Sequence, residues 1–281
     1  MSTSSKISEV EFNLLRDYIE QHCGIALGKE KAYLIETRLT KLMALNGCES
    51  YSDFYRIIKA SADESLKEKI IDAMTTNETL WFRDTHPFLI LAEELLPRLA
   101  AEIKAGKRQK VRIWSAAAST GQEGYSIAMT IHEFCRSNFG VRPEHFEIVG
   151  TDISKSALLL AKAGRYDQLA MNRGMKDEIR DRYFAQSGNT WQINDNIKNM
   201  MALKKFNLQE KPTLLGVFDI VFIRYVLIYF SIELKRAILK NIHAQLAPGG
   251  NLLIGATESL REISEDFDSK TLGGGTYFTR K

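Results

Sequence analysis

The sequence has few cysteines, and they do not group. Cys23, Cys48 and Cys135 are far apart, with no Cys-x-x-Cys pair and no cluster with the five histidines. Such spacing argues against a disulfide framework and against a zinc site. We therefore expect three reduced thiols and no bound metal.

Long apolar runs are also absent. No stretch reaches the roughly eighteen consecutive apolar residues of a membrane-spanning helix. The opening MSTSSKISEV lacks the basic and then apolar build of an export signal. These absences predict a cytoplasmic protein that does not insert into a membrane.

Basic charge is not concentrated in one place. The net charge is +3 over 281 residues, and the densest basic stretch is KAGKRQK at residues 104–110. No aromatic residue interleaves there, which favours a solvated turn over a nucleic-acid-binding patch. The chain is 44% hydrophobic and 26% charged, as in folded proteins with a sizeable core. We expect a globular protein without a nucleic-acid partner.

The first part of the chain has only helical patterns. Ser8 and Glu11 form a capping box that opens an amphipathic helix. A second amphipathic pattern follows, a third helix opens at Ser50 or Ser52, and a fourth completes the series. We predict a small all-helical domain over residues 1–76.

From about Val111, short apolar runs alternate with longer helical stretches, which is typical of a parallel sheet covered by helices. We predict a doubly wound α/β domain over residues 111–281, preceded by an interdomain segment and first helix at 77–110. Residues 166–205 are too long for a simple connection, so we expect an inserted antiparallel β subdomain there. The run at 276–279 predicts an antiparallel edge strand. The apolar runs are VRIWSA, FEIVGTD, VFDIVFIR and NLLIGAT.

Ligands of open α/β sheets bind outside the carboxyl ends of the strands. The loop after the first run, residues 116–123, has small residues that let backbone approach a ligand, although tight packing explains them equally well. Asp152 ends the second run, where we favour ribose binding over a helix cap. Asn207 can donate and accept at an adenine edge, whereas Asp219 alone is more often structural.

Two nucleotide-related patterns are missing. The loop lacks the three-glycine spacing of a dinucleotide fingerprint, which disfavours NAD. The third run leads into Ile223-Arg224-Tyr225-Val226, without the Asp/Asn-Pro-Pro-Tyr run common in adenine-N6 methyltransferases. This difference argues against methylation of nucleic-acid bases.

Several of these pieces together resemble the CheR family of chemotaxis receptor methyltransferases. They occur in the family order and at family-like spacing, and the helical amino-terminal domain fits as well, so the resemblance covers nearly the whole chain. The pieces are TTNETLWFR at 75–83, IWSAAASTGQEGYS at 113–126, GTDIS at 150–154, FNL at 206–208 and FDIVFIRYVLIYF at 218–230.

The resemblance implies a Rossmann-like, S-adenosylmethionine-dependent methyltransferase domain with a small antiparallel β insertion, preceded by a small all-α domain. It implies methyl transfer to glutamate side chains of chemoreceptors, which forms methyl esters for chemotactic adaptation and leaves S-adenosylhomocysteine. Glu123 and Asp152 would grip the cofactor's amino and ribose groups, and Asn207 and Leu208 would flank adenine. The other expected cofactor contacts are Asn77, Thr79, Arg83, Ala117, Arg224 and Tyr225.

The chain departs from the family pattern at two positions. Tyr225 stands where asparagine is usual, so we expect stacking or a bond from the tyrosine hydroxyl in place of the asparagine's polar contact. Gly124 stands where proline is common, which should loosen the helix start without removing Glu123. The tyrosine motivates an alternative, a non-catalytic cofactor-binding regulator. A methyltransferase for small molecules or RNA fits the helical domain less well.

Glutamate methylation needs no general base, because a carboxylate with an ordinary pKa of about 4.3 is already ionised at neutral pH. Holding oxygen, methyl carbon and sulfur in line then carries the catalysis. Arg98 is a candidate for orienting the acceptor carboxylate. Tyr229 either bonds one carboxylate oxygen or is a buried core tyrosine, and the sequence does not separate these interpretations.

The expected partner is the cytoplasmic helical methylation region of chemoreceptors. Basic residues of the helical domain either contact its acidic face or form an ordinary solvated helix face. These residues are Lys29, Lys31, Arg38 and Lys41. Some family members also dock a receptor's carboxy-terminal peptide on the inserted subdomain, a feature that the sequence neither requires nor excludes. We expect a monomer.

Overall fold

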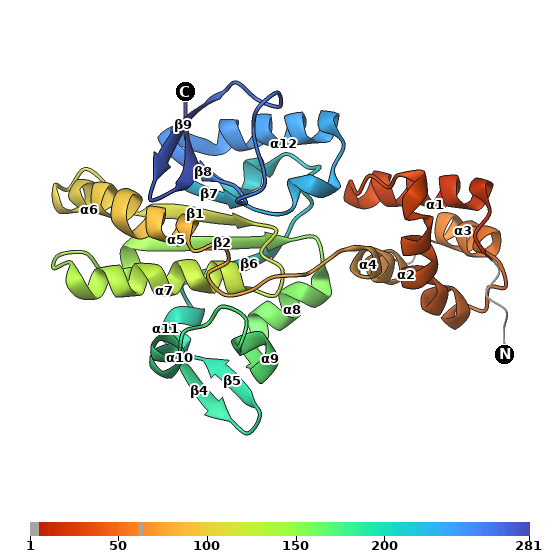
Figure 1. Cartoon of the computed structure of the whole chain (residues 1–281), viewed down its shortest axis with the longest axis horizontal. Helices are drawn as coiled ribbons and strands as arrows, with labels where there is room; N and C mark the ends of the chain where they lie inside the picture. Colours follow the sequence, from red (N-terminus) through yellow and green to blue (C-terminus); the bar gives the residue numbers. More distant parts are fainter. Residues whose placement is uncertain (1–5, 62–63) are drawn as a thin grey trace.

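The computed structural model describes residues 6–61 and 64–281. Its first part is a helical bundle that lies to one side of a sheet domain (Figure 1). The predicted capping box is present, since Ser8 Oγ accepts from Glu11 N and the Glu11 carboxylate accepts from Ser8 N. The four predicted helices are confirmed. They are α1 Glu9–Cys23, α2 Ala32–Leu45, α3 Tyr51–Ala60 and α4 Glu64–Met74, with a 3-10 turn at Lys29–Lys31.

The bundle has its own hydrophobic core. Each helix contributes fully buried apolar side chains at helical spacing, among them Leu15, Ile35, Phe54 and Ile70. Tyr229 of the sheet domain packs against the edge of this core. The bundle core is therefore built mainly from the bundle's own residues.

The sheet domain contains a seven-stranded sheet with the order β6-β2-β1-β7-β8-β10-β9. The first five strands in that order are parallel, and β10 pairs antiparallel with both of its neighbours, β8 and β9. Chain order reverses between β1 and β7, which is where open α/β sheets bind ligands. The strands are β1 Val111–Ala116, β2 Phe146–Asp152, β6 Met201–Lys205, β7 Phe218–Ile223, β8 Leu246–Leu253, β9 Phe267–Leu272 and β10 Gly275–Arg280.

Helices cover both faces of the sheet, so successive strand residues enter different cores. Ile113 and Phe222 pack in one cluster with residues of α6 and α7, whereas Trp114 and Val221 pack in another with residues of α12. The helices are α5 His86–Ile90, α6 Leu96–Lys104, α7 Gln122–Ser137, α8 Lys155–Ala163 and α12 Ile232–Gln245, with a π-helical segment η2 at Leu91–Leu95 joining α5 to α6. Short 3-10 turns lie at Pro143–His145, Pro212–Leu215 and Leu227–Tyr229. No helix in the described ranges is long and apolar enough to cross a membrane.

An antiparallel subdomain is inserted between α8 and β6, with the strand order β3-β5-β4. Its elements are β3 Arg165–Asp167, α9 Gln168–Met171, α10 Asp177–Tyr183, β4 Phe184–Ser187, β5 Thr190–Ile193 and α11 Asp195–Lys198. Two details differ from expectation. Strand β6 lies within 166–205 but pairs with β2 in the main sheet. Strand β10 is antiparallel as predicted, but β9 lies outside it and forms the edge.

Residues 75–85 connect the bundle to the sheet domain and pass across the carboxyl ends of the parallel strands (Figure 1). Trp81 anchors this segment to the insertion. Its ring is fully buried and meets Tyr166 and Phe184 edge-on, with centroids 4.8 and 5.3 Å away. Its amide donates to Arg173 O at 3.0 Å. The connecting segment is therefore held in place at its middle.

Candidate active site

A pocket lies where the connecting segment, the strand ends and the bundle meet. Its walls come from the loops after β1, β2, β6 and β7, from residues 75–83, and from the end of α1. Of the expected site residues, eleven line it: Asn77, Thr79, Arg83, Ala117, Glu123, Asp152, Asn207, Leu208, Arg224, Tyr225 and Tyr229. Side chains from segments distant in sequence thus converge on one cavity.

Asp152 is held rigidly at the end of β2. Its carboxylate accepts from Ser119 N at 2.8 Å and from Ser154 N at 2.9 Å, and the side chain is almost fully buried. Burial raises the pKa of Asp152, although these amide hydrogen bonds oppose the shift. The cap of α8 is Ser154, not Asp152. The helix-cap alternative for Asp152 is therefore wrong, and the residue lines the pocket.

The loop after β1 takes a conformation that few residues adopt. Ala117 and Ser119 have φ values of +65° and +52°, and Gly121 has +97°. Ser119 Oγ donates to Asn77 O at 3.0 Å, which ties the loop to the connecting segment. Backbone in this sparsely populated region is often found at ligand-binding sites, and Ala117 and Ser119 both line the pocket.

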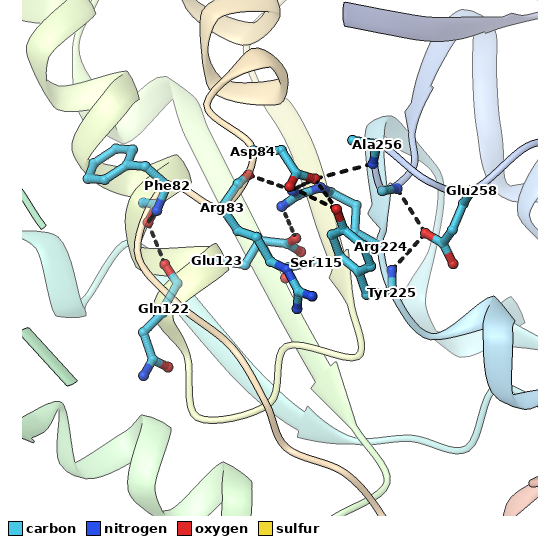
Figure 2. Close-up of polar contacts among 12 residues, drawn as sticks. Phe82, Arg83, Asp84, Ser115, Gln122, Glu123, Arg224, Tyr225, Ala256 and Glu258 are labelled. Atoms are coloured by element: carbon cyan, nitrogen blue, oxygen red, sulfur yellow. Dashed lines mark hydrogen bonds and ion pairs between the residues drawn. The ribbon is translucent and has the colours of Figure 1, made fainter. Parts of the chain in front are cut away.

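Arg224 is the centre of a buried ion-pair network at the end of β7. Nη1 donates to Glu123 Oε2 at 2.9 Å and Nη2 to Asp84 Oδ2 at 2.8 Å, while its side chain is 2% exposed. Glu123 also accepts from Ser115 Oγ at 2.7 Å. Figure 2 shows these groups side by side. The buried guanidinium is thus paired with two carboxylates, so its charge is not left without a partner.

Tyr225 follows Arg224 and has the unusual φ of +56°. Its hydroxyl donates to the Asp84 carboxylate at 2.7 to 2.8 Å, and its amide donates to Glu258 Oε2 at 2.7 Å. The Arg83 guanidinium carbon lies 3.6 Å from its ring centroid. Burial alone would raise the pKa of Asp84, but hydrogen bonds from Tyr225, Ala256 and Arg224 outweigh burial and lower it.

Asn207 lines the pocket, but its side chain has a different use from the one expected. Nδ2 donates to His22 O at 3.0 Å and to Gln209 Oε1 at 3.1 Å, while Oδ1 accepts from Gln209 N. Both amide hydrogens are thus engaged. The amide cannot donate to an adenine edge in this arrangement, and it instead joins the strand ends to the bundle.

Arg98 does not reach the pocket, which corrects its assignment as a group that orients the acceptor. It donates to Gly249 O and to Asn251 Oδ1. Asn251 pairs with Ile220 near the start of β7, whereas the pocket lies beyond the opposite end of that strand. The sequence places Arg98 on an amphipathic helix, but this pattern does not show toward which end of the sheet the side chain lies. Arg98 braces α6 against β8.

Tyr229 is half-buried on the pocket wall, and its carbonyl accepts from Ala26 N at 2.8 Å. It is therefore not a fully buried core tyrosine. Cys23 and Ile25 of the bundle also line the cavity, so the bundle forms one of its walls. Sequence patterns gave no sign of this, because the contacts form between domains.

Two acids beside the pocket were not predicted from the sequence. Asp84 bonds Arg224 and Tyr225, and Glu258 accepts from the amides of Tyr225 and Gly255. Burial raises the pKa of Glu258, with those amides opposing the shift. In the sequence, the only signal for either acid is that Asp84 directly follows Arg83.

A parallel sheet with a β1/β7 switch point, a small-residue loop and an acid that closes β2 together define a Rossmann-like domain that binds an adenosine-containing cofactor. Residues 77–273 match the family model described as CheR methyltransferase, SAM binding domain, and residues 10–75 match CheR methyltransferase, all-alpha domain. The chain belongs to the CheR methyltransferase family.

Relatives of nearly the same length support this assignment. The chain is 44% identical over 275 residues to Chemotaxis protein methyltransferase 1 of Pseudomonas aeruginosa, covering 98% of this chain and 99% of that one. It is 42% identical over 280 residues to the chemotaxis protein methyltransferase of Vibrio parahaemolyticus, covering 99% and 100%. Similarity therefore extends through both the bundle and the sheet domain.

Proposed function

We propose that the protein transfers the methyl group of S-adenosylmethionine to glutamate side chains of chemoreceptors, forming the methyl esters used in chemotactic adaptation. The observation that carries this proposal is the pocket itself. Residues of all five family-like segments line it, together with side chains of the helical domain. The helical domain thus contributes residues to the wall of the proposed cofactor site.

The pocket residues fit the cofactor. The Asp152 carboxylate, fixed by two backbone amides, would accept from ribose hydroxyls. Ile153, Phe206 and Leu208 offer apolar surface for adenine. Asn77, Thr79 and Ala117 would contact the cofactor from the connecting segment and the β1 loop. Arg83 supplies positive charge for a carboxylate.

Glu123 is proposed to hold the cofactor's amino group. Its carboxylate already accepts from Arg224 and Ser115, and it keeps lone pairs beyond those two contacts. Arg224 and Tyr225 complete the same wall. The buried ion pairs fix Glu123 before binding, which reduces the ordering cost on association.

The bound cofactor supplies a methyl group made electrophilic by its positively charged sulfur. The acceptor glutamate oxygen forms a bond to that methyl carbon as the sulfur–carbon bond breaks. The carboxylate loses its charge and S-adenosylhomocysteine remains, so no proton has to move. The chain's residues need only hold the two groups in line and exclude water. Tyr229, half-buried on the pocket wall, is proposed to bond one acceptor oxygen.

The bundle is proposed to recognise the receptor's helical methylation region. Lys31 and Lys41 are exposed and available to its acidic face. Lys29 already pairs with Glu9, and Arg38 donates to the carbonyls of Met74 and Thr75, so their charges also serve the fold. For a receptor's carboxy-terminal peptide, β4 offers an edge strand.

The test is transfer of radiolabelled methyl from S-adenosylmethionine to membranes that carry chemoreceptors, followed by measurement of the base-labile fraction. We expect base-labile label on the receptor with wild-type protein and with Asp195→Asn, an exposed acid in the insertion. Asp152→Ala should abolish it. Cofactor binding without label on any receptor would instead indicate a non-catalytic regulator.

A further inference from the structure

Arg83 carries a positive charge on the pocket wall that no carboxylate neutralises. Among residues 6–61 and 64–281, no ion pair involves Arg83, and its one recorded hydrogen bond is from Nη1 to Glu78 O at 3.2 Å. Arg224, which also lines the pocket, is by contrast paired with two carboxylates. Of these two guanidinium groups, Arg83 is the one available to an incoming anion.

Asp84, the next residue, is turned away from Arg83. Its carboxylate accepts from Tyr225 Oη, Arg224 Nη2 and Ala256 N. Figure 2 shows the Asp84 carboxylate directed toward these donors, while the Arg83 side chain extends away from them. The nearest acid in sequence is therefore occupied and does not compete for the Arg83 charge.

An aromatic face holds Arg83 instead. Its guanidinium carbon lies 3.6 Å from the centroid of the Tyr225 ring, well inside the range of a cation–π contact. This contact orients a guanidinium without supplying a competing anion. A carboxylate partner would have fixed Arg83 equally well but would have cancelled its charge.

The Tyr225 ring is itself held on several sides. The hydroxyl donates to Asp84, and the main-chain amide donates to Glu258, which stabilises the φ of +56°. A Cβ at Gly255 would lie 3.0 Å from ring atoms Cε2 and Cζ, so the ring packs directly on glycine backbone. These contacts fix the ring before any ligand arrives.

We propose that Tyr225 is a positioning residue that seats the Arg83 guanidinium, uncancelled in charge, to receive the carboxylate of the cofactor's amino-acid part. The inference rests on the proposed use of S-adenosylmethionine. It also gives a role to the tyrosine that stands where the family usually has asparagine. The ring acts through Arg83 and need not touch the cofactor.

The experiment measures S-adenosylhomocysteine binding by calorimetry to wild-type protein, Tyr225→Phe, Tyr225→Leu, Arg83→Met and the Arg83→Met/Tyr225→Leu double variant. The comparison ligand is 5′-methylthioadenosine, which has the adenosine and sulfur but no carboxylate. Thermal unfolding checks that each variant is folded. If Tyr225→Leu does not fold, Tyr225→Gly replaces it, because glycine removes the ring and tolerates positive φ.

We expect Tyr225→Leu to weaken S-adenosylhomocysteine binding roughly three- to tenfold, and Tyr225→Phe to retain most of the affinity because the ring remains. Binding of 5′-methylthioadenosine should not change. In the Arg83→Met background, Tyr225→Leu should have no further effect.

Three results would overturn the inference: unchanged affinity in Tyr225→Leu, equal losses for both ligands, or the same loss with Arg83 already removed. Failure of wild-type protein to bind S-adenosylhomocysteine at all is a different result. It would overturn the proposed function, and this inference with it.

Discussion

Arg224 Nη2 donates to Asp84 Oδ2 at 2.8 Å, joining the end of β7 to the segment that connects the two domains. The two side chains are 2% and 18% exposed, so solvent screens this pair little. Glu123 balances the other side of the same guanidinium. The geometry of the pocket wall therefore depends on all three charges together.

Replacing Asp84 by asparagine should destabilise the fold. The substitution keeps the shape but removes one of the two charges that compensate buried Arg224, and it weakens the contact with Tyr225. We expect a loss of about 1–3 kcal/mol in the free energy of unfolding. Urea unfolding measures this loss.

The control is Glu9→Gln, which breaks the exposed Glu9–Lys29 pair and should leave stability unchanged. Equal stability of Asp84→Asn and wild type would contradict this account.

The same pair predicts a pH dependence. Because the network lowers the pKa of Asp84 below its ordinary 3.8, the ionised carboxylate stabilises the folded state. The stability difference between wild type and Asp84→Asn should stay constant from about pH 7 to about pH 5, above the unfolded pKa. It should shrink only as the pH falls below 3.8 toward the lower folded value. A difference already lost at about pH 5 would assign the effect to another group.

Local signals in the sequence were enough for most of the fold. The Ser8–Glu11 capping box and the apolar runs around Ile113 and Ile220 mark their elements directly, because caps and buried central strands have strong patterns. Strand β6 escaped notice because only Met201 among its five residues is fully buried. Its place beside β2 is set by long-range pairing, which a short polar stretch does not reveal.

The site was predictable only where a family-like segment carried it. Asp152 is prominent because it ends a buried strand. Asp84 is not, since its importance comes from Arg224, which is 140 residues away in sequence. Asn207 was assigned to adenine from its chemistry and from the family resemblance, whereas the structure engages its amide with the His22 carbonyl. Side-chain chemistry limits what a residue can bind, but its neighbours decide what it does bind.

Ser154 should contribute more to stability than an ordinary helix cap. Its hydroxyl accepts from Ala157 N at the start of α8 and donates to Asp72 Oδ1 of the bundle at 2.7 Å. Ser231 caps α12 in the same way through Leu234 N. We expect the free energy of unfolding, measured in urea, to fall by about 1 kcal/mol in Ser231→Ala and by about 2 kcal/mol in Ser154→Ala. Equal losses would mean that the bond to Asp72 contributes nothing measurable.

Gly174 permits the close approach of the insertion to the connecting segment. A Cβ there would lie 2.1 Å from Trp81 O, and its φ is +91°. Gly188 also has a positive φ, +57°, but a Cβ there would meet nothing within 4 Å. Backbone strain alone predicts that Gly188→Ala lowers the free energy of unfolding by about 1–2 kcal/mol. Gly174→Ala should lower the free energy of unfolding further. It should also weaken S-adenosylhomocysteine binding, because Trp81 anchors residues that line the pocket.

Calorimetry and urea unfolding of both glycine variants decide this point. Gly188→Ala should bind the ligand as wild type does, since it lies in the β4–β5 turn of the insertion. Matching stabilities and affinities for the two variants would show that the insertion can move away from Trp81 at no cost.

The structure gives a physical reason for glycine at position 124. Gly124 lies in the first turn of α7, and a Cβ there would come within 2.2 Å of Met201 Sδ on β6. A larger residue at 124 therefore needs a smaller one at 201. We expect Gly124→Ala alone to lower the free energy of unfolding by about 1–3 kcal/mol through overpacking. Met201→Ala alone should lower it by about 2–4 kcal/mol, because it leaves a cavity.

The double variant should be more stable than the sum of these losses predicts, by about 1 kcal/mol or more, because each change relieves the defect that the other creates. Urea unfolding of the four proteins gives this coupling energy. Gly188→Ala serves as the control, since nothing lies near its Cβ position and its effect should add to that of Met201→Ala. A coupling energy near zero for Gly124 and Met201 would rule out steric compensation as the reason for glycine at this position.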